Sequence, residues 1–291
     1  MGTNNRGVAA FVVLAFGLGW TLWEVPVLLG LPVTGRMGQL YLLPGAFAPA
    51  LAAIVVRAWI TREGFADAGL NPNLRQWRYY LFAWLLPFPV AAVIAVEAMM
   101  TGLGAPDFSL ARGLTELNAL PESETLRQDA ALAVPMQLAF TALPAAFLLW
   151  GEEFGWRGYL QQRLFAGAPL RAAAATGLIW GAWHFPLILR GVPYTEHPYL
   201  GLLMFPVGAV LLSVIFGWLR AKTGSVWAPS LAHASANSIG VSLTALWFAG
   251  GDPIVTGYLG VLGWIPLGAV CAWVMWRGRL REAVPPAPGT G

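Results

Sequence analysis

The sequence predicts an all-α protein that crosses a membrane about eight times. Its 291 residues are 57% hydrophobic and only 11% charged, and the mean hydropathy is +0.63. Soluble domains carry roughly 25% charged residues. Apolar runs close to the ~20 residues that a helix needs to cross a bilayer recur along most of the chain. Because backbone groups in lipid must be paired within the segment, we expect these runs to be helices.

Eight segments are assigned as membrane spans. In chain order they are about 8–31, 39–57, 79–100, 132–152 or beyond, 172–190, 199–219, 225–249 and 257–276. The first contains Glu24 and is too long for a signal-peptide core, so we expect it to be retained. Residues 1–281 are treated as one transmembrane domain. The tail 282–291 is predicted to be flexible because it is too rich in Pro and Gly to fold alone.

The largest polar insert, about 102–131, carries Leu110, Leu114 and Leu117 at helical spacing. An interfacial helix, a lid and a packed loop are all compatible with this pattern. The lone cysteine, Cys271, lies in the last span, which excludes an intramolecular disulfide and predicts a buried, inert thiol.

The basic residues predict the orientation of the chain. With the N-terminus inside, thirteen of the 17 Lys and Arg residues fall in the cytoplasm, namely Arg6, Arg57, Arg62, Arg75, Arg78, Arg157, Arg163, Arg171, Arg220, Lys222, Arg277, Arg279 and Arg281. Four remain outside: Arg36, Arg112, Arg127 and Arg190. By the positive-inside rule, both termini are then cytoplasmic. The net charge of +3 indicates a face that attracts anionic lipid, and nothing in it indicates a nucleic-acid partner. We expect a multi-pass protein of the plasma membrane.

Three predicted spans each carry a pair of residues one helical turn apart. These pairs are Glu153 with Arg157, Trp180 with His184, and His233 with Asn237. Residues four apart share a helix face, so Glu153 and Arg157 can neutralise each other. Glu152 is rotated by about 100° from Glu153 and should face a different neighbour.

Depth in the membrane favours convergence of these groups. At 1.5 Å rise per residue, Glu152 lies about 16 Å from Arg163, His184 about 20 Å from Arg171, and His233 about 14 Å from Gly224. Ionisable residues within a membrane indicate a functional site. We therefore expect a shared hydrated cavity that is reached from the cytoplasmic side. Pro186 should kink the helix beside His184. Packing or solvent contact is expected instead for Glu24, Glu97 and His197.

Such a cavity suits hydrolysis. Glu152 can take a proton from water with help from His184, while His233 and Asn237 can donate hydrogen bonds to an oxyanion. Glu153 would then be the counter-ion of Arg157. A second chemistry is open, because Glu152, His184 and His233 are also a possible ligand set for catalytic zinc.

The stretches GEEFGWRGYLQQRL, LIWGAWHFPLIL and SVWAPSLAHASANS resemble, in order, the three motifs of the CPBP (Abi) intramembrane protease family. This family includes type II CAAX prenyl endopeptidases and bacteriocin self-immunity proteins. Its pattern is EExxxR, FxxxH and then HxxxN or HxxxB, and the similarity is strong over about 148–240. Trp180 stands where the family usually has Phe.

The resemblance implies an intramembrane endopeptidase that acts on a membrane-associated or lipidated, CAAX-like protein or peptide. It implies Glu152 and His184 for water activation, His233 and Asn237 for the oxyanion, and Glu153, Arg157 and Trp180 as supports. The family is described both as metalloproteases and as glutamate-dependent, so zinc stays open. Two other functions are compatible with the residues: a proton- or cation-coupled transporter, and a non-catalytic immunity or scaffold protein. We find no internal repeat that favours transport.

Overall fold

A computed structural model of the chain describes residues 5–32, 35–119 and 123–276. Every regular element within these ranges is a helix, and none is a strand, so the predicted all-α fold is confirmed. The predicted tail 282–291 lies outside the described residues. Six helical stretches are long and apolar enough to cross a membrane: Asn5–Leu28, Leu40–Ile60, Leu74–Thr101, Gln128–Arg163, Pro198–Thr223 and Pro253–Met275. The protein is thus polytopic, while the number eight and the side of the termini stay predictions.

Within the described residues, the N-terminal half consists of seven α-helices, two of which continue into a π-helical turn. Its helices are α1 (Asn5–Leu28), α2 (Gly35–Ala46), α3 (Ala48–Val55), α4 (Trp77–Leu85), α5 (Pro87–Thr101), α6 (Ala111–Glu116) and α7 (Glu124–Gly155). Two of these stretches continue as π-helix, α3 into η1 (Val56–Ile60) and α7 into η4 (Trp156–Leu160), which leads to α8 (Gln161–Arg163). Helices α1, α2 and α3 pack together, and α3 also contacts α7.

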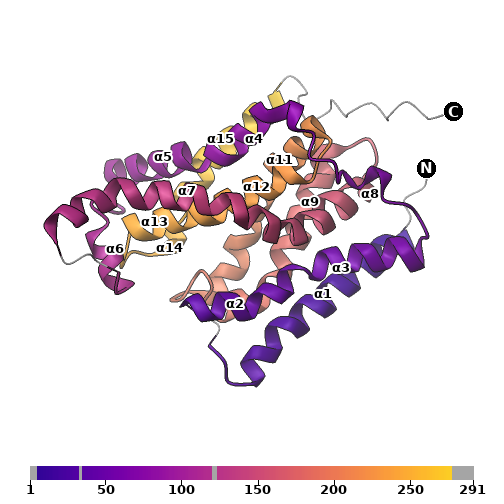
Figure 1. Ribbon diagram of the computed structural model, residues 1–291, viewed down its shortest axis with the longest axis horizontal. Coiled ribbons are helices and arrows are strands. Elements are labelled where there is room, and N and C mark those ends of the chain that lie inside the picture. The colour runs from indigo at the N-terminus through magenta and orange to yellow at the C-terminus, as the bar shows by residue number, and fades with distance from the viewer. Residues whose placement is uncertain (1–4, 33–34, 120–122, 277–291) are drawn as a thin grey trace.

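The C-terminal half supplies the other two motif-bearing segments. Its elements are α9 (Pro169–Trp183), α10 (Phe185–Leu189), α11 (Pro198–Thr223), α12 (Trp227–Ser235), the π-helix η5 (Ala236–Val241), α13 (Ser242–Trp247), α14 (Pro253–Thr256) and α15 (Val261–Met275). Helix α7 lies beside α12 and α13, and α9 beside α11 (Figure 1). The EExxxR motif thus runs from α7 into η4, the WxxxH motif from α9 to the residue after it, and the HxxxN motif from α12 into η5.

Glycines allow α9 to approach α11 closely. A Cβ at Gly177 would lie 2.6 Å from Cα of Val210, and one at Gly181 would lie 2.7 Å from Cα of Pro206. Both positions would clash with backbone, so only Gly fits, as is usual where membrane helices pack tightly. The close approach fixes α9, and with it the residues at its C-terminal end.

The predicted break beside His184 is present. Helix α9 ends at Trp183 and α10 begins at Phe185, so His184 forms the joint, and Pro186 lies in the first turn of α10. The missing N–H of Pro186 explains the interruption. The polar insert contains the short helix α6, with Leu110 and Leu114 buried in a cluster with Leu243 and Leu246. Leu117 is 67% exposed, so the packed-loop alternative describes this insert best.

A network of ions holds together the loops at one end of the bundle. The buried Arg57 guanidinium donates to Asp67 Oδ1 at 2.7 Å and to the carbonyl of Gly158 at 2.9 Å. Arg163 donates to Glu63 at 2.6 Å and to Asp67 Oδ2 at 3.2 Å. Burial alone would raise the pKa of Asp67, but the hydrogen bond from Arg57 and the charges of Arg57 and Arg163 hold it below its usual value.

A lowered pKa of Asp67 makes this network sensitive to acid. A carboxylate whose pKa is depressed in the folded state stabilises the fold above its unfolded pKa, and this contribution is lost as the pH falls below about 4. We expect Asp67→Asn to lower the melting temperature at pH 7. The corresponding loss in the free energy of unfolding should be less than about 1 kcal/mol, because Asp67 is partly exposed. The gap between wild type and variant should narrow in acid. Thermal unfolding in detergent from pH 7 to pH 3 measures it, with Asp129→Asn as the exposed control. A difference in melting temperature that stays constant with pH would contradict the lowered pKa of Asp67.

Candidate active site

Each of the three motifs lies where regular α-helix is interrupted. In the first, η4 begins directly after Gly155, and in the third, η5 begins directly after Ser235. In the second, His184 joins α9 to α10. Single π-helical turns inside longer helices occur frequently at functional sites, because they re-aim side chains on one face.

Glu153 is the buried centre of an ion cluster that connects α7 to α12. Its Oε1 accepts a hydrogen bond from Arg157 Nη1 at 2.8 Å and another from His233 Nδ1 at 3.0 Å. The side chains of Glu153 and Arg157 are both 0% exposed. The Glu153–Arg157 pair follows from their spacing in the sequence. The bond to His233 does not, because the two residues are 80 positions apart.

Arg157 lies between two aromatic rings. Its guanidinium carbon is 4.6 Å from the ring centre of Trp180 and 5.0 Å from that of Phe216. Ring faces attract a cation, and a desolvated contact of this kind contributes about 2 kcal/mol. The rings therefore compensate in part for the two nitrogens of Arg157, Nε and Nη2, that have no hydrogen-bond partner among the described residues.

Glu152 faces a different helix from Glu153, as its rotation on α7 predicts. Its Oε2 accepts a hydrogen bond of 2.8 Å from the indole Nε1 of Trp180 on α9. The carboxylate is nearly buried, with 6% exposure. A Phe at position 180 would have no donor for this oxygen. The departure from the family pattern thus adds one hydrogen bond to the site.

Both histidines are held by Nδ1. In His184 this atom lies 2.9 Å from the carbonyl oxygen of Trp180, and in His233 it lies 3.0 Å from Glu153. Carbonyl and carboxylate oxygens only accept hydrogen bonds, so Nδ1 carries a proton in each ring and Nε2 is left for other partners. The ring of Trp180 contacts both imidazoles, with centres 5.7 Å from His184 and 5.0 Å from His233.

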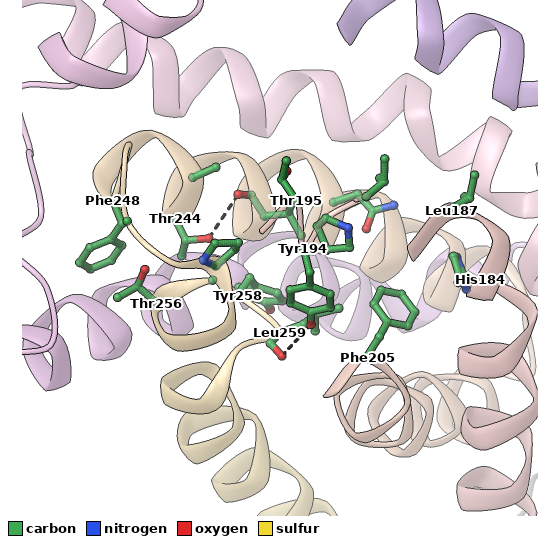
Figure 2. Close-up of a pocket in the computed structure, with 18 of the residues that line it drawn as sticks. His184, Leu187, Tyr194, Thr195, Phe205, Thr244, Phe248, Thr256, Tyr258 and Leu259 are labelled. Carbon is green, nitrogen blue, oxygen red and sulfur yellow. Dashed lines mark hydrogen bonds between the residues drawn. The ribbon is translucent and has the colours of Figure 1, made fainter. Parts of the chain in front are cut away.

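These groups open into one cavity of about 790 Å³. Among the predicted site residues, five line it: Glu152, Trp180, His184, His233 and Asn237. Glu153 and Arg157 do not, and lie behind His233 and Trp180. Figure 2 shows the cavity running from His184 at one end toward Phe248 and Thr256 at the other. The predicted convergence is therefore present, whereas the catalytic roles remain predictions.

The residues that line the cavity can be compared with the predicted topology. Beyond the five site residues, part of its lining comes from helices α10, α11 and α13 and from η5: Leu187, Phe205, Leu212, Val241, Thr244 and Ala245. The rest comes from Glu116 and from residues within 192–196 and 248–259, which lie in or beside connections that the predicted topology places outside. The predicted side of the termini and the expected access from the cytoplasmic side therefore do not agree with each other, and both stay predictions. Depth along the helices does not determine which connections surround the mouth of the cavity.

The residues present do not fit a zinc site. Over the part of the chain that the structure describes, no three His, Cys, Asp or Glu side chains are grouped so that they could hold a metal ion. We therefore derive no step through a metal bound to Glu152, His184 and His233.

The other ionisable residues have separate environments. Glu24 forms an ion pair with Arg190 that the sequence did not reveal. One oxygen of Glu97 is buried without a partner among the described residues. His197 is exposed and lies 3.8 Å from Asp252. None of these lines the cavity.

Comparison with known families gives one match. Residues 132–239 match the family described as "Type II CAAX prenyl endopeptidase Rce1-like". The matched segment, a little over a third of the chain, is similar to this family. This segment contains every predicted site residue, and it confirms the resemblance found in the motifs. The family supports a CAAX-type intramembrane endopeptidase in general and implies a protein or peptide substrate. No curated protein matches the chain.

The buried pair of Glu153 and Arg157 yields a prediction about stability. Removing one partner of a buried ion pair leaves an uncompensated charge and costs about 3–5 kcal/mol. We expect Arg157→Ala to lower the free energy of unfolding by this amount. Arg157→Lys should restore little, because an ammonium group cannot lie flat between two rings. Thermal unfolding in detergent measures both. Arg171→Ala on α9 is the matched control, and an Arg157→Lys variant as stable as wild type would contradict the arrangement.

Proposed function

We propose that this protein is an intramembrane endopeptidase that hydrolyses a peptide bond of a membrane-associated or lipidated protein or peptide, without a metal cofactor. One observation carries the proposal: a carboxylate, two imidazoles and an amide from three separate helices line a single cavity. In this proposal Glu152, His184, His233 and Asn237 are the catalytic residues. The protein works as a multi-pass protein of the plasma membrane.

Glu152 is the general base. Trp180 holds its Oε2, which leaves Oε1 free to accept a proton from a water molecule in the cavity. As the proton moves to Glu152, the water oxygen attacks the carbonyl carbon and a tetrahedral intermediate forms. When the C–N bond breaks, Glu152 returns the proton to the leaving nitrogen. A positioned acid or base of this kind contributes about 10²–10⁴ in rate.

His184 orients the water. The carbonyl of Trp180 fixes Nδ1–H, so that Nε2 accepts a hydrogen bond from the water on its way to attack. The joint between α9 and α10 places this ring at the cavity wall instead of along a straight helix. Because Trp180 binds Glu152 through its side chain and His184 through its carbonyl, one residue sets the geometry of both.

His233 and Asn237 stabilise the oxyanion. Asn237 is exposed to the cavity and offers its amide N–H. With Nδ1–H of His233 bound to Glu153, a second proton on Nε2 makes this ring a donor toward the same oxygen.

The decisive test is the amide substitution at position 152. We expect Glu152→Gln to lower kcat for cleavage of a peptide by purified protein by about 10²–10⁴, with an unchanged melting temperature. Activity of the wild type should not respond to a chelator. Asp129→Asn is the control. Cleavage by Glu152→Gln at the wild-type rate would refute the role of Glu152, and loss of wild-type activity with chelator, restored by zinc, would refute the metal-free mechanism.

Trp180 provides a second, finer test. Trp180→Phe keeps a ring between Arg157 and the histidines but removes the donor to Glu152. A hydrogen bond to a charged group is worth about 1.5–3 kcal/mol, so we expect kcat to fall about 10-fold or more while KM stays unchanged. Trp84→Phe also removes an indole hydrogen bond, to the carbonyl of Ala139 outside the cavity, and should leave kcat unaffected. Equal kcat values in both variants would show that the Glu152 contact does not matter.

A further inference from the structure

Three helices that belong to candidate membrane spans end side by side. Helix α4 begins at Trp77, α11 ends at Thr223 and α15 ends at Met275. Helix α11 contacts both of the others, and Figure 1 shows the three together. The side chain of Asn73, just before α4, donates to the carbonyl of Thr223 at 2.8 Å. A helix that crosses the hydrocarbon core leaves it at the level of the lipid headgroups, so these helix ends lie in the headgroup region.

A groove lies between these helix ends, and we call it the α4 groove. Its volume is about 780 Å³, and Arg75, Arg78 and Lys222 supply its basic lining. Among the described residues that line it, none is Asp or Glu. None of them lines the cavity of the candidate active site. The α4 groove is therefore a separate concavity in which positive charge is concentrated.

Packed aromatic rings connect the three helices around the α4 groove. The ring centre of Trp218 on α11 lies 5.4 Å from Tyr79 and 5.3 Å from Phe82 of α4, and 5.3 Å from Trp273 of α15. Trp218 is 3% exposed, whereas Trp77 is 57% exposed. Trp combines an apolar ring with an N–H donor and is enriched at membrane interfaces. The packing of these rings fixes the spacing of the helix ends, so the groove is already formed without a ligand.

The charges at the start of α4 have the sign that a helix start disfavours. Arg78 lies in the first turn of α4 and Arg75 in the short 3₁₀ turn before it, while that first turn contains no acidic residue. The N-terminal end of a helix carries a partial positive charge, so basic side chains there are unfavourable unless an anion is near. Both arginines are exposed. An anion in the α4 groove would compensate the two guanidinium groups and the helix end together.

We propose that the α4 groove binds the headgroup of an anionic phospholipid. Arg offers paired N–H donors that match phosphate oxygens, and Lys adds a point charge. Basic pockets between membrane helices bind such headgroups. The proposal does not depend on the proposed proteolysis, because the groove shares no lining residue with the catalytic cavity among those that the structure describes.

The surface of α4 beyond the groove favours a lipid over a free phosphate ion. Leu81 and Leu85 follow Arg78 by three and seven residues, so the three side chains lie on one face of the helix. The two leucines are 43% and 40% exposed. A headgroup at Arg78 therefore places its acyl chains along Leu81 and Leu85, whereas a free ion has nothing to bury there.

Native mass spectrometry of the whole chain in detergent tests the proposal, with dioleoyl phosphatidylglycerol and dioleoyl phosphatidylcholine as competing probes. We expect the wild type to prefer phosphatidylglycerol. Arg75→Gln and Arg78→Gln should each weaken this binding about fivefold, the effect of one basic residue beside an anionic membrane surface. Arg171→Gln is the matched control, because Arg171 is also exposed in the first turn of a helix but does not line the groove. An equal loss in all three variants, or no loss in the two groove variants, would overturn the proposal.

A second measurement separates a lipid from a free anion and loss of binding from loss of fold. Inorganic phosphate in excess should not displace phosphatidylglycerol, and displacement would show that the groove takes a free anion instead. Arg78→Lys retains the charge and should keep most of the binding. Without lipid, the groove variants should melt at the wild-type temperature, because both arginines are exposed. Loss of binding in Arg78→Lys equal to that in Arg78→Gln would refute a role for the charge at this position.

Discussion

The hydrogen bonds of Glu153 are the constraint on which the rest of the site depends. One oxygen holds both Arg157 of the first motif and His233 of the third, in a place from which water is excluded. The charges of Glu153 on α7 and Arg157 on η4 compensate each other, and the same carboxylate fixes the imidazole of His233 on α12. The ion pair is costly to bury, but a neutral substitute would lose the orientation of His233. Glu153 does not line the cavity, but it fixes the orientation of His233, which does.

Trp180 connects the second motif to this cluster. Its ring covers the guanidinium of Arg157 and touches both histidines, while its N–H holds Glu152. The close packing of α9 on α11, made possible by Gly177 and Gly181, keeps the indole in place. A Phe would fill the same space and keep the contact with the cation. It would leave the carboxylate of Glu152 free to rotate. The indole N–H of Trp180 therefore fixes the orientation of the Glu152 carboxylate, which the shape of the ring alone would not do.

The sequence predicted what depends on helical periodicity and composition. The all-α membrane fold, the Glu153–Arg157 pair, the break beside His184 and the gathering of Glu152, His184 and His233 all follow from spacing, proline chemistry and the cost of charge in lipid. Contacts between segments far apart in the chain could not be predicted from the sequence. The bond from His233 to Glu153 and the ion pair of Glu24 with Arg190 depend on how helices are rotated against each other. No local pattern encodes that rotation.

The direction of the cavity shows why depth is a weaker argument than it seems. A group about 14–20 Å from the cytoplasmic end of a helix is only about 10–16 Å from the other surface of a hydrocarbon core about 30 Å thick. Equal depth on three helices predicts that side chains meet, but it is symmetric with respect to the two faces. What breaks the symmetry is packing of loops. At the end of the bundle that carries α8, Arg57, Arg163 and Arg220 connect the loops by hydrogen bonds to Asp67. None of these residues lines the cavity. At the other end the loops leave the cavity open among Glu116, Thr195 and Pro253.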